Sequence, residues 1–333
     1  MQSKNSSNGN RGTGKTPNPE LLTPNLVHTP VLLHEAVDLL APRPGGVYVD
    51  GTLGAGGHAE ELLNRSGPDG VLIGMDQDAE AVARSRERLA QYGARAIIRQ
   101  ANYRDIAAII EESGYSSVDG VLLDLGMSWF HLKTPDRGFS FMLDGPLDMR
   151  MDMNGPQTAA DLVNNLPFSE LARIIREYGE EKRAGAIARA IDKARARGPI
   201  TSTAQLADII SSVFPPFPPR RIHPATLTFQ ALRIDVNDEL GALREGLDSI
   251  MELLKPGGRV AIISFHSLED RMVKQTFVHA AKGCICPPKM PVCACGKKPS
   301  FKILTKHPFV AGPEELEKNP ASRSAKLRAA EKI

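Results

Sequence analysis

The sequence predicts an α/β protein in which a parallel sheet is interrupted by a helical insertion. Short apolar runs alternate with helix-like segments over the first half of the chain, and a glycine-rich turn follows the first run. The alternation stops between about Phe130 and Pro224, and another apolar run begins at Arg259. A length of 333 residues is enough for one large domain that carries an insertion.

The expected elements follow in chain order. Parallel strands covered on both faces are nearly uninterrupted apolar runs, and strands that alternate with helices indicate βαβ units. Strands are expected at Val47–Val49, Val71–Met75, Ala96–Arg99, Val118–Leu123 and Arg259–Phe265. Helices are expected at His58–Asn64, Ala79–Tyr92, Ile106–Ser113, Phe168–Tyr178, Glu181–Arg197 and Thr203–Val213, with one long helical pattern over Ala225–Leu254. The last strand therefore returns to the sheet after the helical segment.

The net charge of +2 does not by itself indicate a nucleic-acid-binding protein. Two zones are nevertheless basic, Lys182–Arg197 and Lys297–Ile333, and each has a net charge of +5 when its Lys and Arg are counted against its Asp and Glu. Such zones can follow a phosphate backbone, although a solvated helix face and a soluble tail explain them equally simply.

The polar residues 1–24 predict a disordered tail. The sequence contains no apolar run long enough to span a membrane, and its beginning lacks the apolar core of a secretory signal. A cytoplasmic protein without membrane contact is therefore expected.

The glycine turn raises the question of its ligand. GAGGHA, from Gly54 to Ala59, matches a dinucleotide fingerprint, but that match alone is weak. The backbone N–H groups at a helix start suit either a pyrophosphate or the carboxylate of a methionine moiety. Asp50 precedes the turn, and its carboxylate would repel a pyrophosphate but attract the ammonium group of S-adenosylmethionine (SAM). The acid therefore favours SAM over NAD.

Further side chains at the ends of the expected strands agree with SAM. Asp76 ends the second strand, where a carboxylate can accept ribose hydroxyls of either cofactor. Tyr103 follows the third strand and could stack on adenine, and Asp124 ends the fourth strand, where the reactive carbon would lie.

Several long blocks resemble the MraW (RsmH) family of bacterial 16S rRNA (cytosine-N4)-methyltransferases. They are HTPVLLHEAV, YVDGTLGAGGHAEELL, LLDLGMS, DRGFSFMLDGPLDMRMD, YGEEKRAGAIARAI, HPATLTFQALRIDVNDEL, GGRVAIISFHSLEDRMVK and NPASRSAKLRAAEK. The resemblance implies a class I SAM-dependent methyltransferase (Rossmann-like) sheet formed by residues 25–130 and 225–333. It implies an inserted helical domain at 131–224 for rRNA recognition. It also implies methylation of a decoding-centre cytidine, near the P site, of 16S rRNA in the small ribosomal subunit.

The resemblance also implies site residues. The cofactor contacts of the family fall on Gly56, Gly57, His58, Asp76, Tyr103, Asp124 and His131. The family usually has Phe at the position of Tyr103, which is a conservative change for stacking. It usually has Ser and Gln at the positions of Trp129 and His131, so this chain departs from the pattern beside the expected target pocket.

The chemistry suggests roles for some of these groups. N4 of cytosine is a poor nucleophile because its lone pair is delocalised, so catalysis needs positioning and an acceptor for the amino protons. Asp124, or a backbone carbonyl in Leu125–Ser128, could be that acceptor. Trp129, Phe139 or Phe141 could stack on a base held out of its helix, or could be core residues.

The segment FHSLEDR, Phe265–Arg271, allows two interpretations. His266, Glu269 and Arg271 could shape the cytidine or phosphate pocket. Alternatively, Ser267 could be the N-cap of a helix whose first turn is acidic.

The four cysteines lie close together at positions 284, 286, 293 and 295. Cys284, Cys286, Cys293 and Cys295 could close a tetrahedral zinc site. A reduced surface loop is the alternative, because both pairs are C-x-C rather than the usual C-x-x-C.

Two other functions remain open from the sequence. One is an assembly factor that binds rRNA and SAM without turnover, and the other is an NAD-dependent oxidoreductase. The sequence also leaves the oligomeric state open, a homodimer included.

Overall fold

The computed structural model describes residues 30–215, 222–284, 286 and 295–333. The tail expected at 1–24 and the candidate zinc ligand Cys293 lie outside the described residues, as does the side chain of Trp129.

Seven strands form one sheet in the described part of the chain, in the order β3-β2-β1-β4-β5-β7-β6. Strands β1 to β5 are parallel, whereas β7 is antiparallel to both β5 and β6. The strands are β1 Val47–Asp50, β2 Val71–Asp76, β3 Ala96–Gln100, β4 Val118–Asp124, β5 Leu254–Ser264, β6 Phe301–Ile303 and β7 Lys326–Lys332. An open sheet whose final antiparallel strand inserts beside β5 is the arrangement of class I methyltransferases, which confirms the predicted fold class.

Helices cover both faces of this sheet because neighbouring residues of each strand point to opposite sides. Val121 and Leu123 pack into one core cluster with α4, α11 and α12, whereas Leu122 packs into the other with α1, α2 and α3. These helices are α1 Leu33–Leu40, α2 Gly57–Arg65, α3 Ala79–Leu89, α4 Ile106–Glu112, α11 Glu239–Leu253 and α12 Ser267–Ala281.

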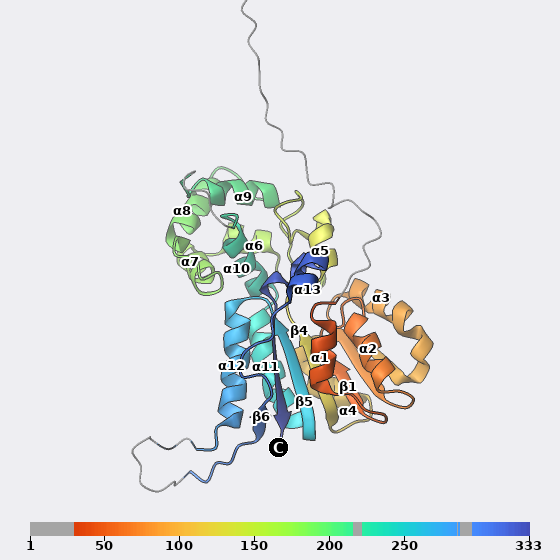
Figure 1. Ribbon diagram of the computed structural model, residues 1–333. Coiled ribbons are helices and arrows are strands. Elements are labelled where there is room, and N and C mark those ends of the chain that lie inside the picture. The colour runs from red at the N-terminus through yellow and green to blue at the C-terminus, as the bar shows by residue number, and fades with distance from the viewer. Residues whose placement is uncertain (1–29, 216–221, 285, 287–294) are drawn as a thin grey trace, which may run out of the picture.

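A helical lobe interrupts the sheet between β4 and β5 and lies beyond one end of the strands (Figure 1). Its helices are α5 Trp129–Lys133, α6 Ala159–Asn165, α7 Phe168–Glu177, α8 Ala184–Arg195, α9 Thr203–Ser211 and α10 Thr226–Val236. The lobe has its own apolar core, which extends from Phe139 to Leu232 and includes Ala225 and Phe229 of the α10 segment. The expected domain limits, with an insertion at 131–224 between 25–130 and 225–333, stay a prediction.

The predicted single helix over Ala225–Leu254 is wrong at one point. Asp238 has a φ of 45°, in the left-handed region, and separates α10 from α11. The break redirects the chain and places Glu239 at the start of α11, where it lines the cleft described below.

The C-terminal segment completes the sheet. The sequence interpretation did not include β6 and β7, nor the short helix α13 Pro313–Lys318. Arg328 of β7 donates to Asp270 of α12 at 2.6 Å, which fixes the strand against a helix on the face of the sheet. Within the described ranges, no helix has the length and apolar character needed to cross a membrane.

Candidate active site

A cleft opens at the carboxyl ends of β1, β2 and β4, where the lobe meets the sheet. This is the edge at which open α/β sheets bind ligands. Its lining includes six of the seven expected cofactor residues, namely Gly57, His58, Asp76, Tyr103, Asp124 and His131. The seventh, Gly56, does not line the cleft, and it caps α2 with a φ of 78° instead.

The glycine turn is held close to the sheet. The amide of Gly54 donates to Asp76 Oδ2 at 2.8 Å, so the turn and the end of β2 are tied together. A Cβ added to Gly57 would lie 2.2 Å from Pro30 Cγ, a separation that no side chain can occupy. The glycine at this position therefore lets α2 begin directly against the N-terminal segment of the described chain.

Asp50 lies beneath the cleft and not on its surface. The residue is 1% exposed, and Thr52 N donates to its Oδ1 at 3.1 Å. No hydrogen-bond donor of the described chain reaches its Oδ2. Burial raises the pKa of Asp50 to about 7. The hydrogen bond from Thr52 N lowers this pKa, and the nearby charge of Asp76 raises it further. The attraction between Asp50 and the ammonium group of SAM that the sequence suggests therefore stays a prediction. The carboxylate does not line the cleft, so it would act on a ligand there through its electrostatic field.

Asp124 has an unsatisfied carboxylate oxygen at the cleft. Its backbone amide donates to Thr52 Oγ1 at 2.5 Å, and its Oδ2 lies 3.9 Å from His58 Nδ1. Its Oδ1 is buried and has no hydrogen-bond partner among the described residues. Burial raises the pKa of Asp124 well above its usual range, and the charges of Asp50 and Glu269 raise it further. A buried acceptor without a donor is a site prepared for a ligand group.

Asp76 is the third acid of the cleft, and it is already partly satisfied. Its two oxygens accept the amides of Gly54 and Asp78 at 2.8 and 2.9 Å. Burial nevertheless raises the pKa of Asp76 above its ordinary value. A carboxylate offers about four acceptor positions, so the same group can still accept ligand hydroxyls.

Tyr103 lines the cleft from the segment after β3. A Cβ on Gly246 of α11 would lie 2.9 Å from its ring, so the ring is packed tightly between helix and cleft. Its hydroxyl is 3.5 Å from the carbonyl of Glu239, at the limit for a hydrogen bond. The flat apolar surface, and not the hydroxyl, is what this side chain contributes.

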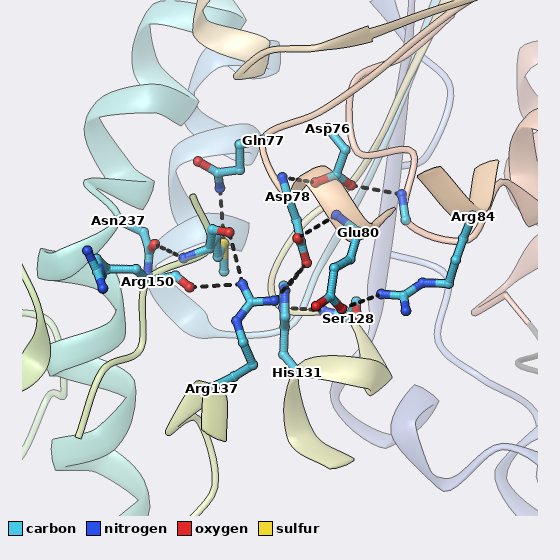
Figure 2. A network of polar contacts seen from close by, with 12 residues as sticks. Asp76, Gln77, Asp78, Glu80, Arg84, Ser128, His131, Arg137, Arg150 and Asn237 are labelled. Carbon is cyan, nitrogen blue, oxygen red and sulfur yellow. Dashed lines mark hydrogen bonds and ion pairs between the residues drawn. The ribbon is translucent and has the colours of Figure 1, made fainter. Parts of the chain in front are cut away.

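His131 lines the cleft and points toward Asp78 (Figure 2). Its Nε2 lies 2.6 Å from Asp78 Oδ2, and its Nδ1 accepts the amide of Ser128 at 3.3 Å. Because Nδ1 accepts, the proton of a neutral ring is on Nε2, which donates to Asp78. His131 therefore connects the start of α5 to the start of α3.

Asp78 is the centre of this network and was missed by the sequence interpretation. It caps α3 by accepting Glu80 N at 3.0 Å, and it accepts Arg137 Nη1 at 3.2 Å besides His131. Burial alone would raise the pKa of Asp78, but the bonds from His131 and Glu80 N and the charge of Arg137 lower it to about 2. Its position directly before a helical pattern is the signal that could have identified it as a cap.

The network continues into the lobe (Figure 2). Arg137 Nη2 donates to the carbonyls of Arg150 and Met151 at 3.0 and 2.9 Å. The amide of Met151 donates to Asn237 Oδ1 at 2.8 Å, and Gln77 Nε2 lies 3.0 Å from its sulfur. Met151 is 6% exposed and lines the cleft, so these bonds fix one wall of the cleft.

A buried ion pair also borders the cleft. Arg233 donates to both carboxylate oxygens of Glu239 at 2.7 and 2.8 Å. Glu239, His266 and Glu269 each offer a ligand atom within 4.8 Å of one another. Arg233 already donates to both oxygens of Glu239, so a metal ion at these three residues would have to compete with its guanidinium group for the carboxylate.

The structure corrects the expected cap of α12. The N-cap is His266, which accepts Glu269 N at 3.4 Å, while Glu269 Oε2 accepts the amides of Phe265 and His266. Ser267 is instead the first residue of the helix, and its hydroxyl donates to Glu180 of the lobe. Glu269 lines the cleft, whereas Arg271 pairs with Glu180 at 2.9 Å.

The two phenylalanines proposed for base stacking pack against other rings of the protein, Phe139 buried and Phe141 half-buried. Phe139 is 5% exposed, and its ring stacks on His131 with centroids 4.6 Å apart. The ring of Phe141 stacks on His223 at 4.5 Å and meets Phe229 edge-on at 5.1 Å. Stacking by Trp129 stays a prediction, because its side chain lies outside the described part.

The charge of the cleft decides between the two cofactors that the turn could hold. Its lining contains Asp76, Asp124, Glu239 and Glu269 but no Lys or Arg among the described residues. A pyrophosphate would find no Lys or Arg of the described lining to offset its charge, whereas SAM brings an ammonium and a sulfonium cation to these acids. The unsatisfied oxygen of Asp124 at the cleft and the buried carboxylate of Asp50 below it fit the cations of SAM and do not fit a pyrophosphate.

The sheet and its acidic cleft define a SAM-dependent methyltransferase. The model of the MraW methylase family matches residues 25–333 of the chain. The chain is 56% identical to the ribosomal RNA small subunit methyltransferase H of Geobacter sulfurreducens over 307 residues, which are 92% of this chain and 99% of that protein. It is 53% identical to the proteins of the same name from Trichlorobacter lovleyi and Carboxydothermus hydrogenoformans, with 92% of this chain and 98% of each relative covered. The chain belongs to the MraW methylase family.

Proposed function

We propose that this chain methylates N4 of one cytidine, of the cytosine 1402 type in the decoding centre, in the 16S rRNA of the small ribosomal subunit. The observation that carries the proposal is the acidic cleft at the carboxyl ends of β1, β2 and β4, with a buried unsatisfied oxygen on Asp124. Membership of the family and the names of the relatives support the substrate. A protein that acts on ribosomal RNA would work in the cytoplasm.

Different residues of the cleft would hold the methionine, ribose and adenine parts of the cofactor. The turn at Gly57 would receive the methionine end, and the fields of Asp50 and Asp124 would favour its cationic groups. Asp76 would accept ribose hydroxyls, and the ring of Tyr103 would pack on the adenine. SAM supplies a methyl group that its sulfonium already activates.

Asp124 is the proposed catalytic residue. Its pKa is raised well above the usual range of a carboxyl group, which brings it nearer the working pH that suits a group accepting a proton. As N4 is methylated it must lose a proton, and Asp124 Oδ1 has no other hydrogen to accept in the described structure. The same carboxylate would orient the amino group before transfer, so that the lone pair of N4 faces the methyl group.

The lack of a nearby thiol favours N4 over C5 as the methylated atom. Attack through C5 of a pyrimidine needs a cysteine adduct. All four cysteines of the sequence lie between positions 284 and 295, and none is among the described residues that line the cleft.

The helical lobe is the proposed rRNA-binding unit. Five cations of the basic zone are exposed, namely Lys182, Arg183, Arg189, Lys193 and Arg197. The sixth, Arg195, donates to the carbonyls of Val163 and Leu166 at 2.8 Å and stabilises the lobe itself. Exposed cations on one lobe would contact rRNA phosphates while the base enters the cleft. A homodimer remains a prediction.

The test is methyl transfer from labelled SAM to small ribosomal subunits purified from cells that lack the activity. The expected result is label in the 16S rRNA with the wild-type chain and a loss of about 10²-fold or more in rate with Asp124→Asn. Asp105→Asn, an exposed acid outside the cleft, is the control and should transfer label at the wild-type rate. Retention of the subunit without transfer would instead support the assembly-factor alternative, and tight binding of NAD would support the oxidoreductase.

A further inference from the structure

Three cysteine side chains come together at a point remote from the cleft. Cys284, Cys286 and Cys295 each offer a sulfur, and these sulfurs all lie within 4.8 Å of one another. They belong to the connection between α12 and β6, which extends from the end of the sheet opposite the helical lobe (Figure 1). None of the three lines the cleft, so methyl transfer does not account for the cluster.

The sulfur separation excludes one explanation and matches another. Cys284 Sγ and Cys295 Sγ are 3.7 Å apart. A disulfide bond requires a separation of about 2.05 Å. Two thiolates bound to one tetrahedral zinc ion, each with a Zn–S bond of about 2.3 Å, lie about 3.8 Å apart. The observed distance is close to that between two corners of a zinc tetrahedron.

The backbone around the sulfurs has the form that supports bound thiolates. The amide of Cys286 donates to Cys284 Sγ at 3.4 Å, and an N–H group directed at a sulfur stabilises its negative charge. Gly296, directly after Cys295, has a φ of 60° and turns the chain away from the cluster. Lys297 then donates to the carbonyl of His279 at 3.1 Å, which ties the second cysteine segment to the last turn of α12.

We propose that Cys284, Cys286 and Cys295 bind one structural zinc ion. Thiolates are soft ligands, which zinc accepts and magnesium or calcium does not. Binding displaces the protons of the thiols. The ion would join the segment that follows α12, with Cys284 and Cys286, to the segment that precedes β6, with Cys295. The ion would stabilise the edge of the sheet. Strand β6 begins six residues after Cys295, and its residue Phe301 is 3% exposed. Cys293 lies outside the described residues, and the proposal rests on the other three.

The first test is the metal content of the untagged full-length chain, purified under reducing conditions from zinc-supplemented cells. Elemental analysis should find about one zinc ion per chain. A mercurial reagent that modifies thiols should release the same amount, as followed with a metal-sensitive dye. Less than about one tenth of an ion per chain, or a disulfide detected by mass spectrometry in the reduced preparation, would overturn the proposal.

Substitutions locate the ion. Cys284→Ser and Cys295→Ser should each lose the zinc, whereas Lys298→Ala, an exposed change in the same connection, should keep it. A cobalt-substituted chain should show the charge-transfer absorption of thiolate ligands, and this readout on the wild-type chain decides the matter if a serine variant does not fold. Zinc that stays bound in both serine variants would refute the assignment. Since the cluster is remote from the cleft, folded variants should still transfer methyl groups, so this test is independent of the proposed function.

Discussion

Neutralising Asp78 is expected to loosen the joint between the sheet and the helical lobe. Asp78 is 2% exposed, and its carboxylate accepts hydrogen bonds from His131 at 2.6 Å and Arg137 at 3.2 Å. Both partners belong to the segment that follows β4. Asp78→Asn keeps the size of the side chain and one acceptor oxygen but removes the charge. Arg137 is then left as a buried cation without its counterion.

The expected loss follows from the pKa of Asp78. The ordinary value of 3.8 is lowered to about 2 in the folded protein. A difference of nearly two units corresponds to about 2 kcal/mol of free energy of unfolding at neutral pH. Because the folded pKa is depressed, this contribution is present above about pH 4 and is lost as the pH falls towards 2. Removing one partner of a buried ion pair costs about 3–5 kcal/mol in other proteins, so a loss of about 2–4 kcal/mol is expected for Asp78→Asn.

The assay is urea-induced unfolding at pH 7, followed by circular dichroism, with SAM affinity measured on the same samples. Glu80→Gln is the matched control because Glu80 lies in the same helical turn and pairs with Arg84 at 3.3 Å, while its side chain is 60% exposed. That exposed pair should contribute less than about 0.5 kcal/mol. If Asp78→Asn unfolds within about 0.5 kcal/mol of the wild type, the role assigned to the network is refuted.

Substitutions at four further positions test individual parts of the site. Because burial raises the pKa of Asp50 from 3.8 to about 7, its contribution to the free energy of unfolding should fall by about 4 kcal/mol as the pH rises through that range. Asp50→Asn should remove this contribution from the pH dependence of thermal unfolding over the same range, and it should weaken SAM binding in calorimetry. Gly57→Ala places a methyl group 2.2 Å from Pro30 and should cost about 1–3 kcal/mol in urea unfolding and reduce SAM affinity. Tyr103→Phe should leave the KM for SAM within about twofold, because its hydroxyl makes only a 3.5 Å contact, whereas loss of the ring in Tyr103→Ala should raise it. Asp124→Asn should reduce kcat by about 10²-fold or more while SAM still binds.

The residues whose position at the cleft could be predicted belong to short stretches of sequence. Each parallel strand is a local apolar run, and an acid directly after such a run must lie at the carboxyl edge of the sheet. Asp76 and Asp124 could therefore be placed together in one cleft although they are 48 positions apart, and the structure has both in its lining. The glycine turn was recognised for the same reason, since its spacing is local.

The parts that were missed depend on contacts between distant segments. His131 was identified, but its partner Asp78 lies 53 positions earlier, and no local pattern pairs them. The break at Asp238 was hidden because the helical periodicity continues on both sides of it. Strand β7 was missed because KLRAAEK has the composition of a helix, and only its pairing between β5 and β6 makes it a strand.

The identity of the methylated atom tests the central claim most directly. Small ribosomal subunits from cells lacking the activity would be treated with the wild-type chain and SAM, and their 16S rRNA would then be digested to nucleosides for mass spectrometry. The acidic cleft, with Asp124 and with no cysteine among the described residues that line it, predicts N4-methylcytidine as the product, absent after treatment with Asp124→Asn. A product methylated at C5 of cytosine or on the ribose would contradict the account.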